Sequence, residues 1–149
     1  MKKYSGFMQE ALKEAEAAFS EDEVPVGAAV VYKGRIISRA HNQVERLKDP
    51  TAHAEMLALT SAANYLKAKW LSGATLYVTI EPCSMCAGAL VLARIKKLVY
   101  GASDPKTGAC GSITNIANNR KLNHRIEVKK GVLEKECSRL LKDFFKKKR

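Results

Sequence analysis

Two short segments, His53-Ala54-Glu55 and Pro82-Cys83-Ser84-Met85-Cys86, place the strongest constraint on how this chain can fold. The two cysteines are three positions apart and directly follow a proline, so they would share one face of the first turn of a helix. His53 and Glu55 are two positions apart, and in the middle of a helix they would point to nearly opposite sides. Both can approach a single ion only at the first turn of a helix. The sequence therefore predicts two helix N-termini that face each other across one metal ion.

The donor atoms of these segments favour zinc. One imidazole and two thiolates are ligands that zinc accepts, and three protein ligands leave a fourth position for water, as in catalytic sites. The predicted ligands are His53, Cys83 and Cys86. Zn²⁺ with two thiolates and a neutral imidazole carries no net charge, so its water loses a proton less readily and a nearby base should help. Glu55 is suited to that role, and we do not count it as a fourth ligand.

Together these residues resemble the H-x-E…P-C-x-x-C signature of the zinc-dependent nucleobase deaminases. The resemblance covers nearly the whole chain, and in its details it is to the tRNA-specific adenosine deaminase branch of that family. It is carried by residues 23–28, 41–42, 49–55, 76–83, 101–108 and 122–125. The resemblance implies a three-layer, cytidine deaminase-like α/β fold, in which a central mixed sheet of about five strands has helices on both faces.

The resemblance also implies an activity, the hydrolytic deamination of adenosine to inosine at the wobble position of the anticodon of an arginine tRNA. One zinc ion per subunit would activate water, and Glu55 would carry protons from that water to the base and to the departing ammonia. A homodimer that binds the anticodon stem-loop is a further implication. The substrate contacts predicted in this way are Asn42, Ala54, Asp104 and Lys106.

Length and composition limit the remaining possibilities. We expect residues 1–149 to form a single domain, long enough to bury a core without disulfides. No apolar run approaches the length of a membrane span, and the first residues do not resemble a signal peptide, so we expect a cytoplasmic protein. Two of the four cysteines have metal spacing. The other two, Cys110 and Cys137, are predicted to be buried thiols.

Positive charge is concentrated near the C-terminus. The chain carries a net charge of +11, and residues 120–149 hold 12 of its 26 Lys and Arg but only 4 of its 15 Asp and Glu. Such a segment suits a phosphate-bearing partner, here tRNA with no DNA expected, and it equally suits a solvated helix face. Phe145 lies about 100° around the helix from the apolar Phe144. We predict that Phe145 stacks on an unpaired base, although widening the core or meeting a second subunit remain alternatives.

Apolar periodicity predicts helices and strands that alternate over the second part of the chain. An amphipathic helix over residues 7–19 ends in an acidic run, 20–23, that we expect to be a solvated loop. A hairpin follows, with strands at 27–32 and 35–41. The later predicted elements are a buried helix from 54 to about 65 capped by Asp49 or Thr51, a strand at 75–80, a helix reaching 92, a strand at 98–100 and a last helix with Leu133, Cys137, Leu140, Leu141 and Phe144 on one face. This alternation favours an α/β fold with parallel pairing in its second part.

Some of these residues also have simpler explanations. By residue type alone, Asn42 is a turn former, His41 is a surface or satisfied histidine, and the loop 104–111 is a plain left-handed turn. Three other functions also remain open. They are a deaminase of small substrates such as cytosine, cytidine or guanine, a non-catalytic RNA-binding subunit with structural zinc, and a thiol redox protein that uses Cys83 and Cys86.

Overall fold

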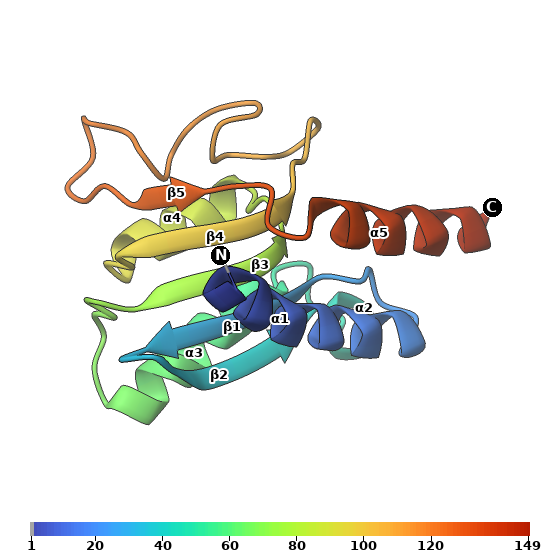
Figure 1. Ribbon diagram of the computed structural model, residues 1–149, viewed down its shortest axis with the longest axis horizontal. Helices are drawn as coiled ribbons and strands as arrows, with labels where there is room; N and C mark the ends of the chain where they lie inside the picture. The colour runs from blue at the N-terminus through green and yellow to red at the C-terminus, as the bar shows by residue number, and fades with distance from the viewer. Residues whose placement is uncertain (1) are drawn as a thin grey trace.

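The computed structural model describes residues 2–149, and within this range the predicted alternation of helices and strands is present (Figure 1). In chain order the elements are α1 (Lys2–Ser20), β1 (Gly27–Tyr32), β2 (Arg35–His41), α2 (Val44–Leu47), α3 (Ala54–Leu66), β3 (Thr75–Ile80), α4 (Ser84–Leu92), β4 (Lys97–Ala102), β5 (Glu127–Lys129) and α5 (Glu134–Lys148). The sequence pattern does not reveal α2 and β5, because 4 and 3 residues are too few to display a period. None of the helices within residues 2–149 combines the length and hydropathy that crossing a bilayer requires.

The strands form one mixed sheet in the order β2-β1-β3-β4-β5. β1 pairs antiparallel with β2 and with β3, whereas β4 pairs parallel with β3 and with β5. The β1–β2 pair is the predicted hairpin. Its turn residues, Lys33 and Gly34, have φ angles of 52° and 77°, the left-handed pair that matches the twist of a two-residue hairpin. Parallel pairing is confined to the second part of the chain, as predicted.

Helices cover both faces of this sheet (Figure 1). α1 and α5 lie next to each other on one face, and α3 and α4 lie on the other. Because successive strand residues point to opposite faces, neighbours on β3 and β4 enter different cores. Leu76 and Leu98 belong to the core under α3 and α4, whereas Tyr77 and Val99 belong to the core under α1 and α5. The prediction of a mixed sheet between two helical layers is confirmed.

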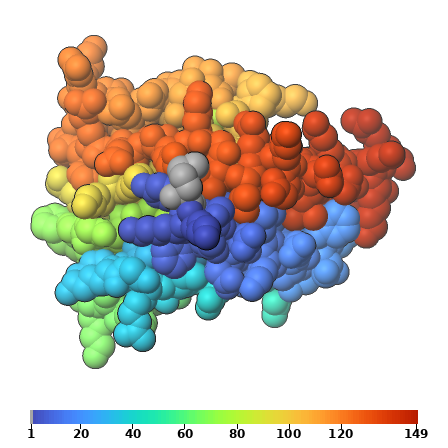
Figure 2. Space-filling model, in the orientation of Figure 1, coloured from blue at the N-terminus to red at the C-terminus, as the bar shows by residue number. Residues whose placement is uncertain are grey.

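The end of α5 lies against the segment that joins α1 to β1 (Figure 2). Lys148 Nζ is 2.6 Å from a carboxylate oxygen of Asp22. Phe144 is buried, as the sequence predicts, and its ring meets that of Phe19 edge-on at 5.8 Å. The C-terminal helix is therefore held on the end of α1 by both apolar and charged contacts.

The acidic run after α1 is not wholly the solvated loop that the sequence predicts. Glu23 is 1% exposed, and its carboxylate accepts hydrogen bonds from the N–H groups of Glu45 at 3.0 Å and Arg46 at 2.8 Å. These groups belong to the first turn of α2, which has no side-chain cap hydrogen bond from its own N-cap residue. The prediction was wrong because the donors lie 22 and 23 residues further along the chain, where no local pattern connects them to Glu23.

The predicted caps of α3 are also wrong. α3 begins at Ala54, and its N-cap residue, His53, makes no side-chain cap hydrogen bond. The Asp49 carboxylate instead accepts from the N–H and hydroxyl of Thr51, at 2.8 and 2.7 Å. Asn42 Oδ1 accepts the Ala54 N–H at 3.0 Å. The start of α3 is thus stabilised by a residue that directly follows β2.

The two cysteines outside the metal-spaced pair are buried thiols, as predicted. Cys110 is 5% exposed and Cys137 is 1% exposed. Burial raises the pKa of each thiol to about 12, so both remain protonated and unreactive near neutral pH.

Candidate functional site

The predicted metal ligands come from the N-termini of two helices. His53 is the N-cap residue of α3, Cys83 is the N-cap residue of α4, and Cys86 lies in the first turn of α4. The chain enters α4 directly from β3, through Glu81 and Pro82. Because an N-cap side chain projects past the end of its helix, side chains from two such ends can meet at one point.

The three ligand atoms are close enough to surround one tetrahedral ion. They all lie within 4.8 Å of one another. His53 Nδ1 is 3.7 Å from Cys83 Sγ and 3.5 Å from Cys86 Sγ. Bond lengths of about 2.0 Å from zinc to nitrogen and about 2.3 Å from zinc to sulfur, at a tetrahedral angle, give a nitrogen–sulfur separation of about 3.5 Å. The residues present therefore fit zinc in donor type and in spacing.

The two thiols of this cluster differ in how readily they ionise. Hydrogen bonding to the Cys86 thiol and to His53 lowers the pKa of Cys83 to about 3. The hydrogen bond to Cys83, together with burial, raises the pKa of Cys86 far above its ordinary value. In the metal-free protein, therefore, the Cys83 thiolate accepts a hydrogen bond from the Cys86 thiol. Metal binding would release the proton of Cys86, because thiols ligate metals as thiolates.

Glu55 lies beside the cluster, in the first turn of α3. Its side chain is buried, and burial raises the pKa of this carboxyl group to about 7, although its own backbone N–H, the charge of His53 and the Cys86 thiol oppose the shift. Glu55 lines the same cavity as His53 and Cys83. A carboxyl group with a pKa near neutrality can both accept and release a proton at working pH. Position and acidity therefore suit an acid–base group.

The cavity in front of the cluster has a volume of about 740 Å³. Its walls come from the α1–β1 segment, the end of β2, α2, the loop after β4 and the end of α5. Asn42 lines this cavity and is 8% exposed. Since Asn42 Oδ1 is bonded to the Ala54 N–H, its NH₂ group supplies the donors that remain. Ala54 itself is fully buried and is not among the lining residues.

The other predicted substrate contacts differ in their relation to the cavity. Asp104 lines it, but its carboxylate accepts the N–H groups of Lys106 and Thr107, at 3.0 and 3.1 Å. Lys106 is exposed and does not line the cavity. Phe145 is 48% exposed and also lies outside the lining, to which Phe144 contributes instead. The structure thus brings Asn42 and Asp104 to the site but leaves Lys106 and Phe145 at the surface.

Sequence reasoning missed the role of Glu81, another buried carboxylate that lines this cavity. Glu81 is 1% exposed, and its carboxylate accepts the N–H groups of Asp104, Cys110 and Ser112, each at 3.0 Å, as well as the Ser112 hydroxyl. A Cβ atom at Gly108 would lie 2.4 Å from the Glu81 carboxyl carbon, so only glycine fits there. The available signal was a glutamate at the end of an apolar strand, where a charge needs partners.

Comparisons with known proteins agree with this geometry. A sequence model of the MafB19-like deaminase family matches residues 3–149. The tRNA-specific adenosine deaminase of Aquifex aeolicus is 54% identical over 143 residues, which cover 96% of this chain and 94% of that protein. The chain belongs to the tRNA-specific adenosine deaminase family. This membership favours a deaminase over the thiol redox protein that the Cys83–Cys86 spacing left open.

Solved structures extend the similarity to the fold. A tRNA:A34 deaminase, studied for A-to-I editing at the wobble position of transfer RNA, has a TM-score of 0.88 and 45% identity, covering 91% of this chain and 99% of that one. Guanine deaminase from Nitrosomonas europaea has a TM-score of 0.78 and 28% identity, covering 94% of this chain and 83% of that one. The five-stranded mixed sheet with helices on both faces is the cytidine deaminase-like fold that the sequence analysis expects.

Proposed function

We propose that this protein converts adenosine to inosine at the wobble position of a tRNA anticodon, by hydrolytic deamination. One observation carries the proposal. A buried carboxyl group, Glu55, lines the cavity beside a His-Cys-Cys cluster, and its pKa is raised to about 7. A purely structural metal site has no use for a further carboxyl group at that position. The Aquifex relative and the tRNA:A34 deaminase support the choice of substrate.

His53, Cys83 and Cys86 would hold one Zn²⁺ per subunit. When bound, zinc would supply Lewis acidity that makes a neighbouring water easier to deprotonate. The spacing of the three ligand atoms supports this assignment, since the observed nitrogen–sulfur distances of 3.7 and 3.5 Å lie close to the tetrahedral value of about 3.5 Å.

Glu55 would carry the protons of the reaction. Its carboxylate takes a proton from the attacking water as the bond from oxygen to adenine C6 forms, and it passes this proton to ring nitrogen N1. A second proton then moves from the new C6 hydroxyl group, through Glu55, to the amino group. The C6–N bond breaks, ammonia leaves and inosine remains. Burial, which raises the pKa of this carboxyl group, supports its accepting and releasing protons within one cycle.

Several other residues would hold the substrate. Asn42 offers its NH₂ group to acceptors on the base, next to Ala54, whose N–H it already binds. The turn at Asp104 presents the exposed Lys106, which we assign to the RNA backbone. The exposed ring of Phe145 offers a stacking face. The target base must leave its stack to enter the cavity, and this costs least in a single-stranded loop.

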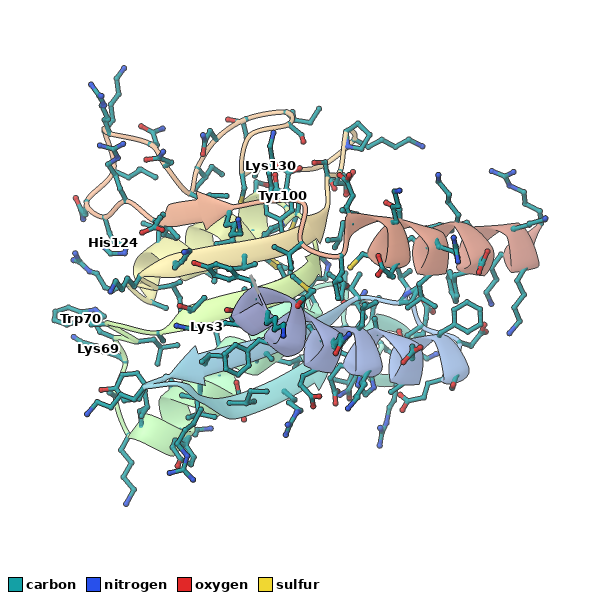
Figure 3. All side chains as sticks on the ribbon, viewed as in Figure 1. Lys3, Lys69, Trp70, Tyr100, His124 and Lys130 are labelled. Carbon is teal, nitrogen blue, oxygen red and sulfur yellow. The ribbon has the colours of Figure 1, made fainter. Side chains whose placement is uncertain are left out.

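We further propose that the protein is a homodimer and that it works in the cytoplasm, on an arginine tRNA. Some large apolar side chains are exposed, namely Leu92 at 78%, Ile113 at 61% and Trp70 at 51%. Trp70 projects with Lys69 at the end of the sheet away from α5 (Figure 3), and Lys69 and Arg94 lie 4.8 and 5.3 Å from its ring centroid. Leu92 and Ile113 are therefore the better candidates for a subunit contact, and sedimentation should give twice 16.4 kDa.

The direct test is incubation of the zinc-loaded protein with anticodon stem-loops, followed by nucleoside analysis. One stem-loop carries adenosine at the wobble position of an arginine tRNA, a second carries it elsewhere in the same loop, and a third has the wobble adenosine of another tRNA. Inosine from the first alone is the expected result. Equal product from the first and third would remove the arginine assignment, and product from the second would remove the wobble position.

Free adenosine, cytidine and guanine are included in the same test, because a guanine deaminase shares the fold at 28% identity. Product from free bases or nucleosides, and none from RNA, would replace our proposal with a deaminase of small substrates. If the protein binds zinc but forms no product from any substrate, the result would replace our proposal with a non-catalytic RNA-binding subunit.

A further inference from the structure

His41, at the end of β2, is bound by two carboxylates. Its Nδ1 is 2.9 Å from Glu14 Oε1, and its Nε2 is 3.1 Å from Glu21 Oε1. Both glutamates belong to α1 or the turn that follows it, and the His41 side chain is only 14% exposed. A neutral imidazole has one N–H donor, whereas a carboxylate can only accept. Two such contacts at hydrogen-bond distance therefore require both ring nitrogens to carry a proton, so His41 is an imidazolium.

No other charged group of residues 2–149 forms an ion pair or hydrogen bond with this ring. Gly27 of β1 lies opposite His41 in the sheet and carries no charge. Arg39, two residues earlier on β2, is bonded to Glu10 instead, at 3.3 Å. Burial alone would lower the pKa of His41, but the hydrogen bonds and charges of Glu14 and Glu21 outweigh it and raise this pKa above the ordinary value.

The ring joins two walls of the cavity. Asn42, the next residue, lines the cavity, donates its own N–H to Val26 O at 3.1 Å and accepts the Ala54 N–H. On the other side, Glu21 also lines the cavity. The imidazolium therefore fixes the end of α1 to the point at which Asn42 leaves the sheet.

We propose that His41 is a positioning residue of the reaction. Its positive charge fixes Glu21 and Asn42 relative to each other in the cavity wall, so that loss of its proton weakens substrate binding. This rests on the proposed function. The residue acts through Asn42 and makes no contact with the reacting atoms.

The pH dependence has a definite sign. The contacts of the His41 imidazolium with Glu14 and Glu21 form a clamp between β2 and the end of α1. The pKa of His41 is higher in the folded than in the unfolded state, so this clamp is complete at low pH and is lost as the pH rises through the folded pKa. KM for the stem-loop should therefore rise on the alkaline side, with kcat much less affected. For a partly exposed charge cluster of this kind we expect roughly a twofold to fivefold change in KM.

The test compares the zinc-loaded wild-type protein with His41→Gln, His41→Arg and Glu10→Gln between pH 6 and 9. We expect His41→Gln to have the raised KM at every pH, and His41→Arg, which keeps the charge and both donors, to restore a low and pH-independent KM. Glu10→Gln is the matched control, because Glu10 is on the same helix but pairs with Lys13 and Arg39. A raised KM in this control, or an unchanged KM in His41→Gln, would overturn the proposal.

The protonation state itself can be read without any activity. The chain has three histidines, so ¹⁵N spectra of the imidazoles are simple, and the His41 signals are those that His41→Gln removes. We expect the His41 nitrogens to keep their imidazolium shifts to a higher pH than an ordinary imidazole, whose pKa is about 6.5. Titration at or below about 6.5, the ordinary value, would refute the clamp even if the enzyme works. If the spectra show an imidazolium but no stem-loop is deaminated, the clamp stands and the proposed function fails.

Discussion

Glu55 and Glu81 are two glutamates that line the same cavity and have almost equally small exposed fractions. Their surroundings nevertheless shift the pKa of the carboxyl group in opposite directions. No main-chain N–H from another segment of residues 2–149 donates to Glu55, and burial raises its pKa to about 7. For Glu81, burial is outweighed by the Ser112 hydroxyl and the N–H groups that it accepts, so its pKa lies below the ordinary value. The difference teaches that solvent exposure alone does not separate a proton carrier from a structural anchor, because the supply of hydrogen-bond donors also sets the pKa of a buried carboxyl group.

The largest expected effect comes from removing the proton carrier. Glu55→Gln keeps the shape of the side chain but cannot carry a proton, so kcat on the stem-loop should fall by roughly 10²–10⁴-fold or more. Zinc content, measured by atomic absorption, should stay at one ion per subunit, because Glu55 is not a ligand. Glu81→Gln is the matched control and should retain far more of the rate. Comparable losses in the two variants would mean that both carboxylates act in the same way.

The second-largest effect is on stability and concerns Glu81, the structural anchor. Glu81→Gln places an amide where one carboxylate now satisfies three N–H groups and a hydroxyl, so it should lower the free energy of unfolding by about 4 kcal/mol. Urea denaturation at pH 7 measures this. Because the folded pKa of Glu81 is lowered, its contribution is present above the unfolded value and is lost as the pH falls through the folded value. The difference between variant and wild type should therefore shrink in acid.

The third effect is also on stability, but Glu55 should change it with pH in the direction opposite to Glu81. In the zinc-free protein, Glu55 should reduce stability as the pH rises from its ordinary pKa of 4.5 to about 7, because the folded state binds the proton more tightly than the unfolded state. Zinc-free Glu55→Gln should therefore be more stable than zinc-free wild type at pH 8, by an amount on the order of 3 kcal/mol. The two proteins should converge near pH 4. A destabilised Glu55→Gln at pH 8 would mean that Glu55 has anchoring partners after all.

The smallest effect comes from removing one of the hydrogen-bond donors to the Glu81 carboxylate. Ser112→Ala deletes the hydroxyl that reaches Glu81 but leaves the Ser112 N–H in place. The expected loss in unfolding free energy is about 1 kcal/mol, with the folded pKa of Glu81 moved upward. Thr107→Ala, which removes a hydroxyl from Asp104 in the same loop, is the control for the loss of a hydroxyl alone. No difference between the two variants would show that Glu81 does not depend on Ser112.

Much of the fold could be predicted because its signals are local. The apolar period of α1 and the turn at Lys33-Gly34 are visible within a few residues, and the spacing of Cys83 and Cys86 demanded a helix N-terminus. The roles of Glu23 and Glu81 could not be predicted. Their donors lie between 22 and 31 residues away in the chain, and nothing in the residue types reveals that pairing.

The sequence by itself determined the chemistry available to this protein, because an imidazole, two thiols and a carboxyl group at those spacings fit one metal ion only at helix N-termini. Tertiary structure decided how those groups behave. Within residues 2–149 it buried Glu55 with no main-chain N–H from another segment to accept, surrounded Glu81 with such donors and set His41 between Glu14 of α1 and Glu21 of the turn after it. The physical reason is that residue type and spacing are properties of the chain, whereas desolvation and hydrogen-bond supply depend on which distant segments fold against each group.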